Sequence, residues 1–143
     1  MKNISIIYWS ATGNTEKMAK AIAEGTNVEG NVVKVIEVGK ASKDDVLNAD
    51  AIALGCPSMG AEVLEEDEME PFIQSLETYN LKDKPMALFG SYDWGDGQWM
   101  REWEDRMKKR GVNLVDEGLI VQNTPDEEAL MQCRQLGAKL INS

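Results

Sequence analysis

The sequence predicts a doubly wound α/β fold, in which a five-stranded parallel sheet carries helices on both faces. Apolar β-branched runs alternate along the chain with segments of helical periodicity, and no Pro/Ser-rich linker or internal repeat breaks this alternation. The runs are apolar at successive positions, as in strands that are buried on both faces. With 143 residues, of which 43% are hydrophobic, the chain has the size of a single domain spanning residues 1–143.

The predicted strands are short apolar runs that end at residues favouring turns. The first stops at a small, hydroxyl-rich loop, Pro57 ends the third, and a Gly/Asp-rich loop follows the fourth. Periodicity does not set the spatial order of the strands, but the order 2-1-3-4-5 would bring the loops after strands one, three and four together at the switch point, where such sheets bind ligands, and it is the order we expect. The five runs are residues 4–9, 31–38, 51–56, 86–91 and 113–121.

The predicted helices are recognised by their apolar stripes and their capping residues. Ser42 and Asp45 are placed as a capping box, and Thr124-Pro125-Asp126-Glu127 is a typical helix start. We expect helices at residues 16–24, 42–48, about 69–79, 98–110 and from 127 onward. Their core-facing residues include Trp99, Trp103 and Met107 in the fourth helix and Ala129, Leu130, Cys133, Leu136, Leu140 and Ile141 in the fifth.

The composition argues against several classes of function. The chain has no histidine and its two cysteines, Cys56 and Cys133, lie far apart, so zinc sites and histidine-based triads are disfavoured and two buried, reduced thiols are expected. The net charge of −10 disfavours nucleic acid and anionic membranes and favours a protein partner with a basic surface. No stretch has membrane-spanning length and no signal-peptide pattern is seen, so we expect a cytoplasmic protein.

The loop after the first strand has the features of an anion site. Its side chains Ser10, Thr12, Asn14 and Thr15 offer three hydroxyls and an amide at the start of a helix whose first N–H groups lack helical partners, and Gly13 frees the turn. The loop contains no lysine and has neither the Gly-Lys-Ser/Thr ending of a triphosphate loop nor the three glycines of a dinucleotide fold. It predicts a permanently bound monophosphate, although a simple Ser/Thr helix cap would give the same pattern.

Two further loops carry residues that suit a flat ligand. One loop contains a tryptophan that no local pattern points toward the core; it is Ser91-Tyr92-Asp93-Trp94-Gly95-Asp96-Gly97. In the other, the thioether of a methionine precedes a glycine and a carboxylate; it is Pro57-Ser58-Met59-Gly60-Ala61-Glu62. Trp94 and Met59 are placed to cover two faces of a ring, and Glu62 to accept from an imide N–H. The alternatives are that Trp94 folds onto the fourth helix and that Met59 fills a gap beneath the loop. Trp9, at the end of the first strand, is expected in the core.

Together the three loops resemble the flavin-binding loops of flavodoxins, most closely the short-chain flavodoxins of anaerobic bacteria, and the resemblance covers essentially the whole chain. The matching segments are Thr12-Gly13-Asn14-Thr15, Met59-Gly60 with Glu62, and Ser91-Tyr92-Asp93-Trp94-Gly95-Asp96-Gly97, with no insertion expected to break the strand at 113–121. The resemblance implies a flavodoxin-like fold and a monomeric, low-potential one-electron carrier that binds one FMN noncovalently. It further implies partners among larger redox enzymes with basic docking patches, the ferredoxin- or flavodoxin-dependent oxidoreductases, and no substrate turnover by the chain itself.

The resemblance also implies roles for individual residues. The hydroxyl-rich loop would hold the phosphate, Met59 and Trp94 would cover the two flavin faces, and Glu62 would accept from flavin N3. The peptide at Gly60 would turn toward flavin N5 on reduction, and N–H groups from Asp93 onward would face the pyrimidine end. The implied cofactor-binding residues are Ser10, Ala11, Thr12, Gly13, Asn14, Thr15, Ser58, Met59, Gly60, Ala61, Glu62, Ser91, Tyr92, Asp93, Trp94 and Gly95.

The chain departs from the family pattern at three positions and is rich in acidic residues near the expected site. Pro57 stands where a serine often adds a hydroxyl to the phosphate site, and Ala61 and Asp93 stand where Asp and Gly are familiar. The acidic residues would disfavour further negative charge on a bound flavin and would steer basic partners, or would merely form a solvated loop and helix start. They are Glu62, Glu65, Glu66, Asp67, Glu68, Glu70, Asp93 and Asp96.

Two other functions are compatible with the same strand order. An FMN-dependent NAD(P)H:quinone-type reductase needs an open flavin face and a nicotinamide site, and both Trp94 and the short chain argue against it. A phosphoacceptor signalling domain needs an aspartate at the end of the third strand and a lysine after the fifth. In this chain Cys56-Pro57 and Asn123-Thr124 occupy those places.

Overall fold

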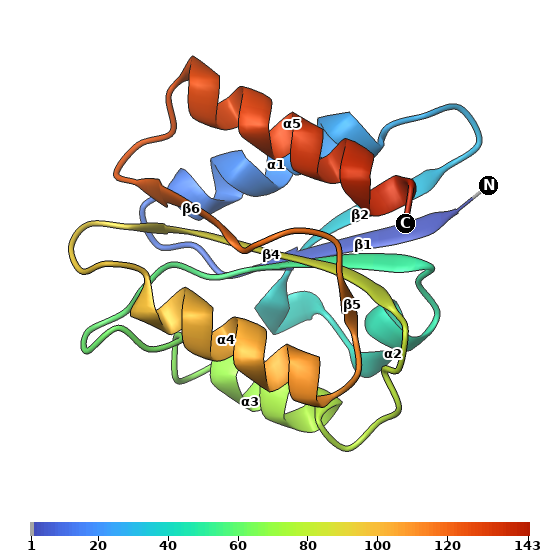
Figure 1. Ribbon diagram of the computed structural model, residues 1–143, viewed down its shortest axis with the longest axis horizontal. Helices are drawn as coiled ribbons and strands as arrows, with labels where there is room; N and C mark the ends of the chain where they lie inside the picture. The colour runs from blue at the N-terminus through green and yellow to red at the C-terminus, as the bar shows by residue number, and fades with distance from the viewer. Residues whose placement is uncertain (1) are drawn as a thin grey trace.

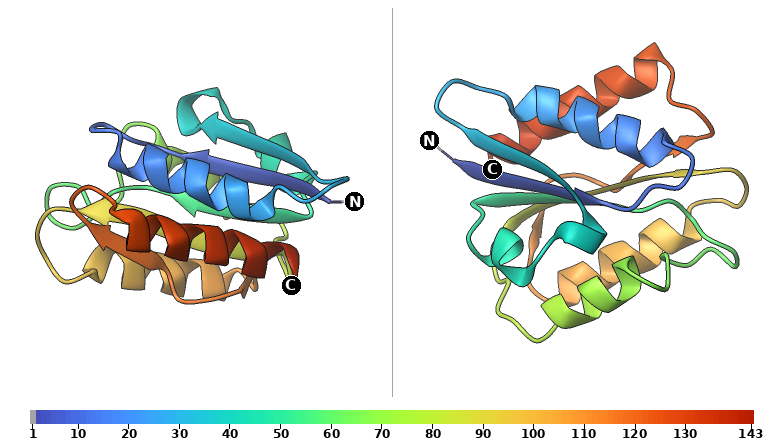
Figure 2. Two further views of the ribbon diagram at one scale, coloured as in Figure 1. Left: turned by 90° about the horizontal axis from the view of Figure 1, so that it is seen from above. Right: turned by 180° about the vertical axis from the view of Figure 1, so that it is seen from behind.

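The computed structural model, which describes residues 2–143, is a three-layer α/β structure (Figure 1). Helices α1 and α5 cover one face of the central sheet, and α2, α3 and α4 cover the other, as the views from above and behind show (Figure 2). In chain order the elements are β1 (Asn3–Tyr8), α1 (Asn14–Thr26), β2 (Val32–Glu37), the 3-10 helix η1 (Val38–Lys40), α2 (Lys43–Leu47), β3 (Ala51–Gly55), α3 (Met69–Leu76), β4 (Pro85–Tyr92), α4 (Gln98–Lys109), β5 (Asn113–Leu114), β6 (Leu119–Gln122) and α5 (Glu127–Ile141).

The sheet is parallel and has the order β2-β1-β3-β4-β5, with β6 also paired to β4. The doubly wound fold class and the order 2-1-3-4-5 are therefore confirmed. Because all strands run in one direction, the loops after β1, β3 and β4 emerge at the same edge of the sheet, on the left in Figure 1. This topology brings the three predicted loops together.

The prediction of one continuous strand at 113–121 is wrong, because the strand is interrupted between β5 and β6. In the interruption, the N–H of Glu117 donates to Asp116 Oδ1 at 2.8 Å and the N–H of Gly118 donates to Glu104 Oε2 at 2.8 Å. These side-chain acceptors replace the partners that a neighbouring strand would supply. The run of two acidic residues and a glycine is a local signal for such a break, although the flanking residues are apolar.

The other element boundaries differ from the predicted ones by a few residues, mainly at caps. Helix α1 begins at Asn14, because Gly13 adopts a φ of 94° and supplies the turn directly before it. The predicted capping box of Ser42 and Asp45 is present at α2. Asp126 caps α5, since its Oδ1 accepts from the N–H of Ala129 at 2.8 Å.

The hydrophobic core forms two clusters, one on each face of the sheet. Neighbouring residues of β1 point to opposite faces, so Ile6 belongs to the cluster beneath α1 and α5 and Ile7 to the cluster beneath α3 and α4. The predicted core residues of α4, namely Trp99, Trp103 and Met107, are buried. In α5 Ala129, Cys133, Leu136 and Leu140 are buried, while Leu130 and Ile141 pack at the margin.

Both cysteines are free and buried, as expected. Within residues 2–143, no helix combines the length and the apolar composition needed to cross a bilayer.

Candidate functional site

The three loops at the carboxyl edge of the sheet enclose a small cavity of about 100 Å³. Its lining comes from the loop after β1, from the loop after β3 and from the end of β4, so the structure unites segments that are far apart in the sequence. The lining residues are Ser10, Ala11, Thr12, Asn14, Thr15, Pro57, Ser58, Met59, Ser91, Tyr92 and Asp93. All of them except Pro57 were predicted as cofactor-binding residues.

The part of this cavity formed by residues 10–15, which we call the anion cradle, has the donors that an anion site needs. Ser10 shapes the loop, since its Oγ accepts from the N–H groups of Gly13 at 3.1 Å and Glu16 at 3.3 Å. Among residues 2–143, no protein acceptor pairs with the backbone N–H groups of Asn14 and Thr15, the first two residues of α1. These donors point out of the helix N-terminus, where the helix dipole also favours a negative charge. The cradle is thus ready to bind an anion without a basic side chain.

The floor of the cradle is fixed by a buried pair of hydroxyls. Thr15 Oγ1 and Ser91 Oγ lie 2.9 Å apart, and the N–H of Ser91 donates to Thr15 Oγ1 at 3.3 Å. Both side chains are buried. This contact joins the start of α1 to the end of β4, so it holds two of the three loops in register.

The loop after β3 makes a tight turn, the ring turn, at residues 59–63. Met59 and Val63 exchange two backbone hydrogen bonds, with N–H to oxygen distances of 2.9 and 3.0 Å. Between them Gly60 has a φ of 42° and Glu62 a φ of 56°, so both residues occupy the left-handed region. A glycine accepts this conformation without cost, whereas a glutamate does so only when other contacts hold it there.

Glu62 is held by the loop after β4, which connects the two loops predicted to bind the ring. Its Oε1 accepts from the N–H groups of Asp96 at 3.2 Å and Gly97 at 3.3 Å. Gly95 makes the approach possible, because a Cβ at this position would collide with the Glu62 carboxylate. The sequence did not predict this link, since no local pattern pairs residue 62 with residues 96 and 97.

Trp94 and Met59 lie in two of the three loops, Trp94 at the surface and Met59 at the cavity. The Trp94 side chain is 61% exposed, so the alternative that it folds onto α4 is wrong. Met59 is half-buried and lines the cavity, and it belongs to neither hydrophobic cluster. Trp94 directly precedes Gly95, which has a φ of 93°, so the indole stands on a turn and is free to contact a ligand.

Glu65 anchors the far end of the same loop and was missed as an anchor by sequence reasoning. Its buried carboxylate accepts from the N–H groups of Asp67 and Glu68, both at 2.7 Å, and of Met69 at 2.9 Å. Burial by itself raises the pKa of Glu65, but the three N–H donors outweigh it and leave the pKa below its ordinary value. The carboxylate therefore stays charged and caps the start of α3.

Cys56 supports this anchor as a neutral thiol. Its Sγ accepts from the N–H of Glu65 at 3.4 Å, and its S–H donates to the carbonyl of Pro57 at 3.4 Å. Burial raises the pKa of Cys56 to about 12, so it is not a reactive thiolate near neutral pH.

Trp9 is not a core residue as expected, because it is only partly buried. Its indole Nε1 donates to Glu68 Oε1 at 3.3 Å, while the ring packs against the cluster beneath α3 and α4. The polar end of the indole thus needs an acceptor at the surface. The contact connects the residue before the anion cradle with the loop that carries the ring turn.

The acidic residues divide into two groups. Glu65 caps α3, Glu62 holds the ring turn, and Glu70 forms a bidentate pair with Arg106 at 2.8 and 2.9 Å, which lowers the pKa of Glu70. These three carboxylates hold local structure through their hydrogen bonds, in addition to carrying charge. The remaining five are exposed and lie in the loops after β3 and β4. We call them together the acidic face, which consists of Glu66, Asp67, Glu68, Asp93 and Asp96.

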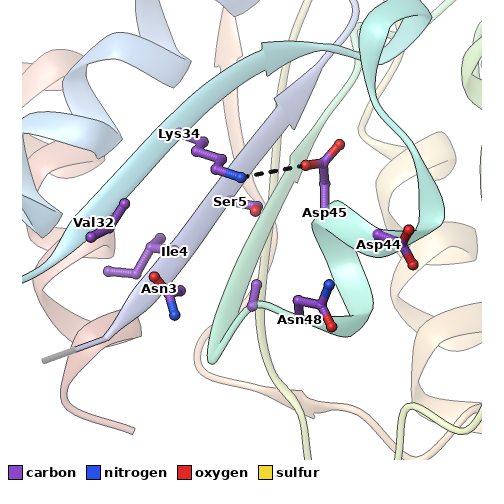
Figure 3. Close-up of a pocket in the computed structure, with 9 residues that line it drawn as sticks. Asn3, Ile4, Ser5, Val32, Lys34, Asp44, Asp45 and Asn48 are labelled. Atoms are coloured by element: carbon purple, nitrogen blue, oxygen red, sulfur yellow. Dashed lines mark ion pairs between the residues drawn. The ribbon is translucent and has the colours of Figure 1, made fainter.

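A larger polar cavity of about 270 Å³ lies on the α2 side of the sheet, at the opposite edge (Figure 3). It is lined at the start of β1 by Asn3 and Ser5, and Lys34 and Asp45 point toward one another across it at 3.9 Å. Helix α2, five residues long, is too short to cover this part of the sheet. The cavity contains none of the predicted site residues.

Comparisons with known proteins agree with this arrangement. The family model for flavodoxin matches residues 6–137. The flavodoxin of Clostridium beijerinckii is 51% identical over 97% of this chain and 99% of its own length, and that of Megasphaera elsdenii is 41% identical over 94% and 95%. The solution structure of two-electron reduced Megasphaera elsdenii flavodoxin matches with a TM-score of 0.87 at 38% identity, covering 98% of this chain and 99% of that one. The chain therefore belongs to the flavodoxin family, the electron carriers that bind FMN and are not themselves enzymes.

Proposed function

We propose that this chain is a monomeric, single-domain, low-potential carrier that takes one electron at a time onto FMN in the cytoplasm and delivers it to larger redox enzymes. The observation that carries the proposal is the meeting of three loops at one edge of the sheet, where an anion cradle without basic side chains lies beside an exposed tryptophan. We further propose that the sixteen residues predicted above form the FMN site.

The anion cradle fits the phosphate of FMN. Its unpaired N–H groups at Asn14 and Thr15 are hydrogen-bond donors to phosphate oxygens, and the hydroxyls of Thr12 and Ser58 line the same cavity. Because no lysine or arginine lines it, hydrogen bonds and the helix dipole must supply the attraction. Such a site suits a phosphate that stays bound rather than one that is transferred.

The ring turn and the loop after β4 fit the flavin ring. Bound FMN supplies the reversible uptake of single electrons. Met59 covers one face of the ring and Trp94 the other, and together they exclude water from it. One carboxylate oxygen of Glu62, Oε1, accepts hydrogen bonds from the loop after β4. Among residues 2–143, no group donates to the other oxygen, Oε2. Oε2 is therefore available to accept a hydrogen bond from the imide N–H of the flavin.

The acidic face supports a low reduction potential and a basic partner. Each carboxylate about 10 Å from the ring opposes an added negative charge by about 0.4 kcal/mol in water, and by more where water is excluded. The same charges attract enzymes with basic docking patches, which we propose to be ferredoxin- or flavodoxin-dependent oxidoreductases.

Stepwise anaerobic reduction of the purified holoprotein tests the carrier function. We expect one FMN per chain, two well-separated one-electron steps in the visible spectrum, and no reduction by NADPH unless a flavodoxin reductase is added. Direct reduction by NADPH in one two-electron step would instead establish the alternative, an FMN-dependent NAD(P)H:quinone-type reductase. A colourless chain that FMN does not restore would contradict both.

Binding of FMN and riboflavin tests the site. The Asn14→Ala variant should weaken the binding of FMN by roughly tenfold, which corresponds to about one charge-assisted hydrogen bond. Its affinity for riboflavin should be almost unchanged, because riboflavin lacks the phosphate. The Trp94→Ala variant should weaken both flavins equally, because they share the ring. An equal loss of affinity for FMN and for riboflavin in Asn14→Ala would contradict the assignment of the cradle to the phosphate.

A further inference from the structure

We propose that Arg101 is a positioning residue for the flavin ring, because it fixes the two N–H groups that hold Glu62. The inference rests on the proposed function, in which Glu62 accepts a hydrogen bond from the flavin imide. It goes beyond that function by assigning a role to a residue of α4 that does not line the cavity between the three loops.

The contact between Glu62 and the loop after β4 joins the two loops that would hold the ring. Glu62 Oε1 accepts from the N–H groups of Asp96 at 3.2 Å and of Gly97 at 3.3 Å, and we call these two hydrogen bonds the ring clasp. Both are longer than most N–H···O hydrogen bonds, and Glu62 must also keep its positive φ of 56°. The ring clasp therefore depends on contacts that fix its donors.

Arg101 fixes the donors of the ring clasp from α4. Its Nη1 donates to the backbone carbonyl of Asp96 at 2.9 Å, and its Nη2 donates to Asp96 Oδ1 at 3.0 Å. One guanidinium thus binds the main chain and the side chain of the residue whose N–H is the first donor of the ring clasp. The second donor belongs to Gly97, which is buried at the N-cap of α4 and has a φ of 92°. The donor pair is therefore held between Arg101 and the start of the helix.

The place of Arg101 along α4 is explained by these contacts. The other basic residues of α4 lie in its last turn, where the helix dipole favours a cation. Arg101 lies near the opposite end, where the dipole gives a cation no such advantage. Its side chain reaches back toward Asp96 and passes beside Gly97, since a Cβ at Gly97 would lie 3.7 Å from Arg101 Nη1.

The pair of Arg101 and Asp96 contributes to the geometry of the site more than to global stability. Their side chains are 57% and 78% exposed, and an exposed ion pair adds little to the free energy of unfolding. A flavin, by contrast, binds to chains in which the ring clasp is closed and Glu62 Oε2 faces the imide, so its affinity falls with the closed fraction. Without Arg101 we expect this fraction to fall to between about one half and one fifth.

Arg101→Met tests the inference, with Lys108→Met as the matched control. Both variants remove one positive charge from α4, and both side chains line the same surface cavity, but among residues 2–143 Lys108 forms no side-chain hydrogen bond or ion pair. We expect Arg101→Met to bind FMN and riboflavin about twofold to fivefold more weakly, by the same factor because they share the ring. Lys108→Met should change either affinity by less than about 1.5-fold. Quenching of flavin fluorescence on titration of the apoprotein measures both affinities, and urea unfolding should give the wild-type midpoint for both variants.

Two further measurements separate this role from a purely structural one. In the apoprotein, the Gly97 amide should exchange with solvent about threefold or more faster in Arg101→Met than in Lys108→Met, because the ring clasp opens more often. In a Glu62→Ala background, Arg101→Met should have almost no further effect on flavin affinity, because Arg101 acts through Glu62.

Three results would each overturn the inference while leaving flavin binding itself intact. They are an unchanged Gly97 exchange rate in Arg101→Met, equal losses of affinity in Arg101→Met and Lys108→Met, and an undiminished loss in the Glu62→Ala background. A wild-type chain that binds neither flavin would instead show that the proposed function is wrong. The Gly97 exchange rate of the apoprotein would then still decide whether Arg101 fixes the donors of the ring clasp.

Discussion

At the scale of single residues, the site depends on a few side chains that satisfy backbone groups of distant loops. Glu65 is the clearest case, because one buried carboxylate accepts from three consecutive N–H groups at the start of α3. Glu62 does the same for the loop after β4. Removing the Glu65 acceptor leaves partly or fully buried donors without partners, which costs more than the hydrogen bonds contribute.

Glu65→Ala should lower the free energy of unfolding by about 2 kcal/mol, because the three donors lose their acceptor and α3 loses its cap. Urea unfolding of the apoprotein measures this loss. Glu66→Ala, at the exposed neighbouring position, is the matched control and should change stability by less than about 0.5 kcal/mol. A similar loss in both variants would show that the loop tolerates neither change for reasons other than capping.

The lowered pKa of Glu65 also predicts a pH dependence with a definite sign. Because the folded pKa lies below the unfolded value of about 4.3, the unfolded chain binds more protons in this range. The stabilisation by the charged carboxylate is therefore complete above about pH 5 and is lost as the pH falls through the folded pKa. In Glu65→Gln this part of the acid destabilisation should be absent, which unfolding curves between pH 6 and pH 3 would show.

At the scale of elements, α1 and α5 pack so closely that two glycines are required. A Cβ at Gly25 would collide with the backbone carbonyl of Arg134, and one at Gly137 would collide with the carbonyl of Ile22. Gly25 lies in the last turn of α1, whereas Gly137 is an interior position of α5, where glycine is otherwise unfavourable by about 1 kcal/mol relative to alanine. The close contact, rather than helix propensity, determines these residues.

Gly137→Ala should therefore destabilise the protein by about 2 kcal/mol, although alanine is the better helix former. The increase in steric strain exceeds the gain in propensity because backbone atoms, unlike side chains, cannot move aside. Gln135→Ala on the exposed side of α5 serves as control and should be neutral or slightly stabilising. Thermal unfolding of both variants measures the difference, and a stabilised Gly137→Ala would contradict the close packing.

Helix α2 is another element that depends on a distant residue. It has five residues, too few to persist alone, and Lys84 Nζ donates to the carbonyls of Val46, Leu47 and Ala49 at 3.1, 3.1 and 2.8 Å. Lys84→Met should cost about 1 to 2 kcal/mol in urea unfolding, because these carbonyls lose their donor. Lys82→Met, at an exposed position nearby, should have little effect.

At the scale of the whole molecule, we expect the net charge of −10 and the acidic face to steer basic partners toward the site. Reduction by an NADPH-dependent flavodoxin reductase should slow as ionic strength rises, because salt screens the attraction between opposite charges. The double variant Glu66→Gln, Asp67→Asn should reduce both the rate at low salt and its salt dependence. Stopped-flow measurements of the reduction rate would show this. Glu29→Gln, which removes a negative charge beyond the end of α1, is the control. An unchanged salt dependence in the double variant would contradict docking on the acidic face.

The sequence by itself determined the fold class, the caps of α2 and α5 and the three loops that follow β1, β3 and β4. These features depend on local signals, namely apolar periodicity, β-branched runs, capping residues and glycines at turns, which act between residues close in the chain. The capping box at Ser42 and Asp45 and the buried stripe of Trp99, Trp103 and Met107 are predicted correctly for this reason.

The tertiary structure decided which distant groups pair. Local sequence does not show that Glu62 binds the N–H groups of residues 96 and 97, that Trp9 donates to Glu68, or that Thr15 pairs with Ser91. Each of these contacts joins segments separated by more than 30 residues, and each side chain has several local alternatives of similar energy. Only the packing of parallel strands, which places their carboxyl ends side by side, selects one of them.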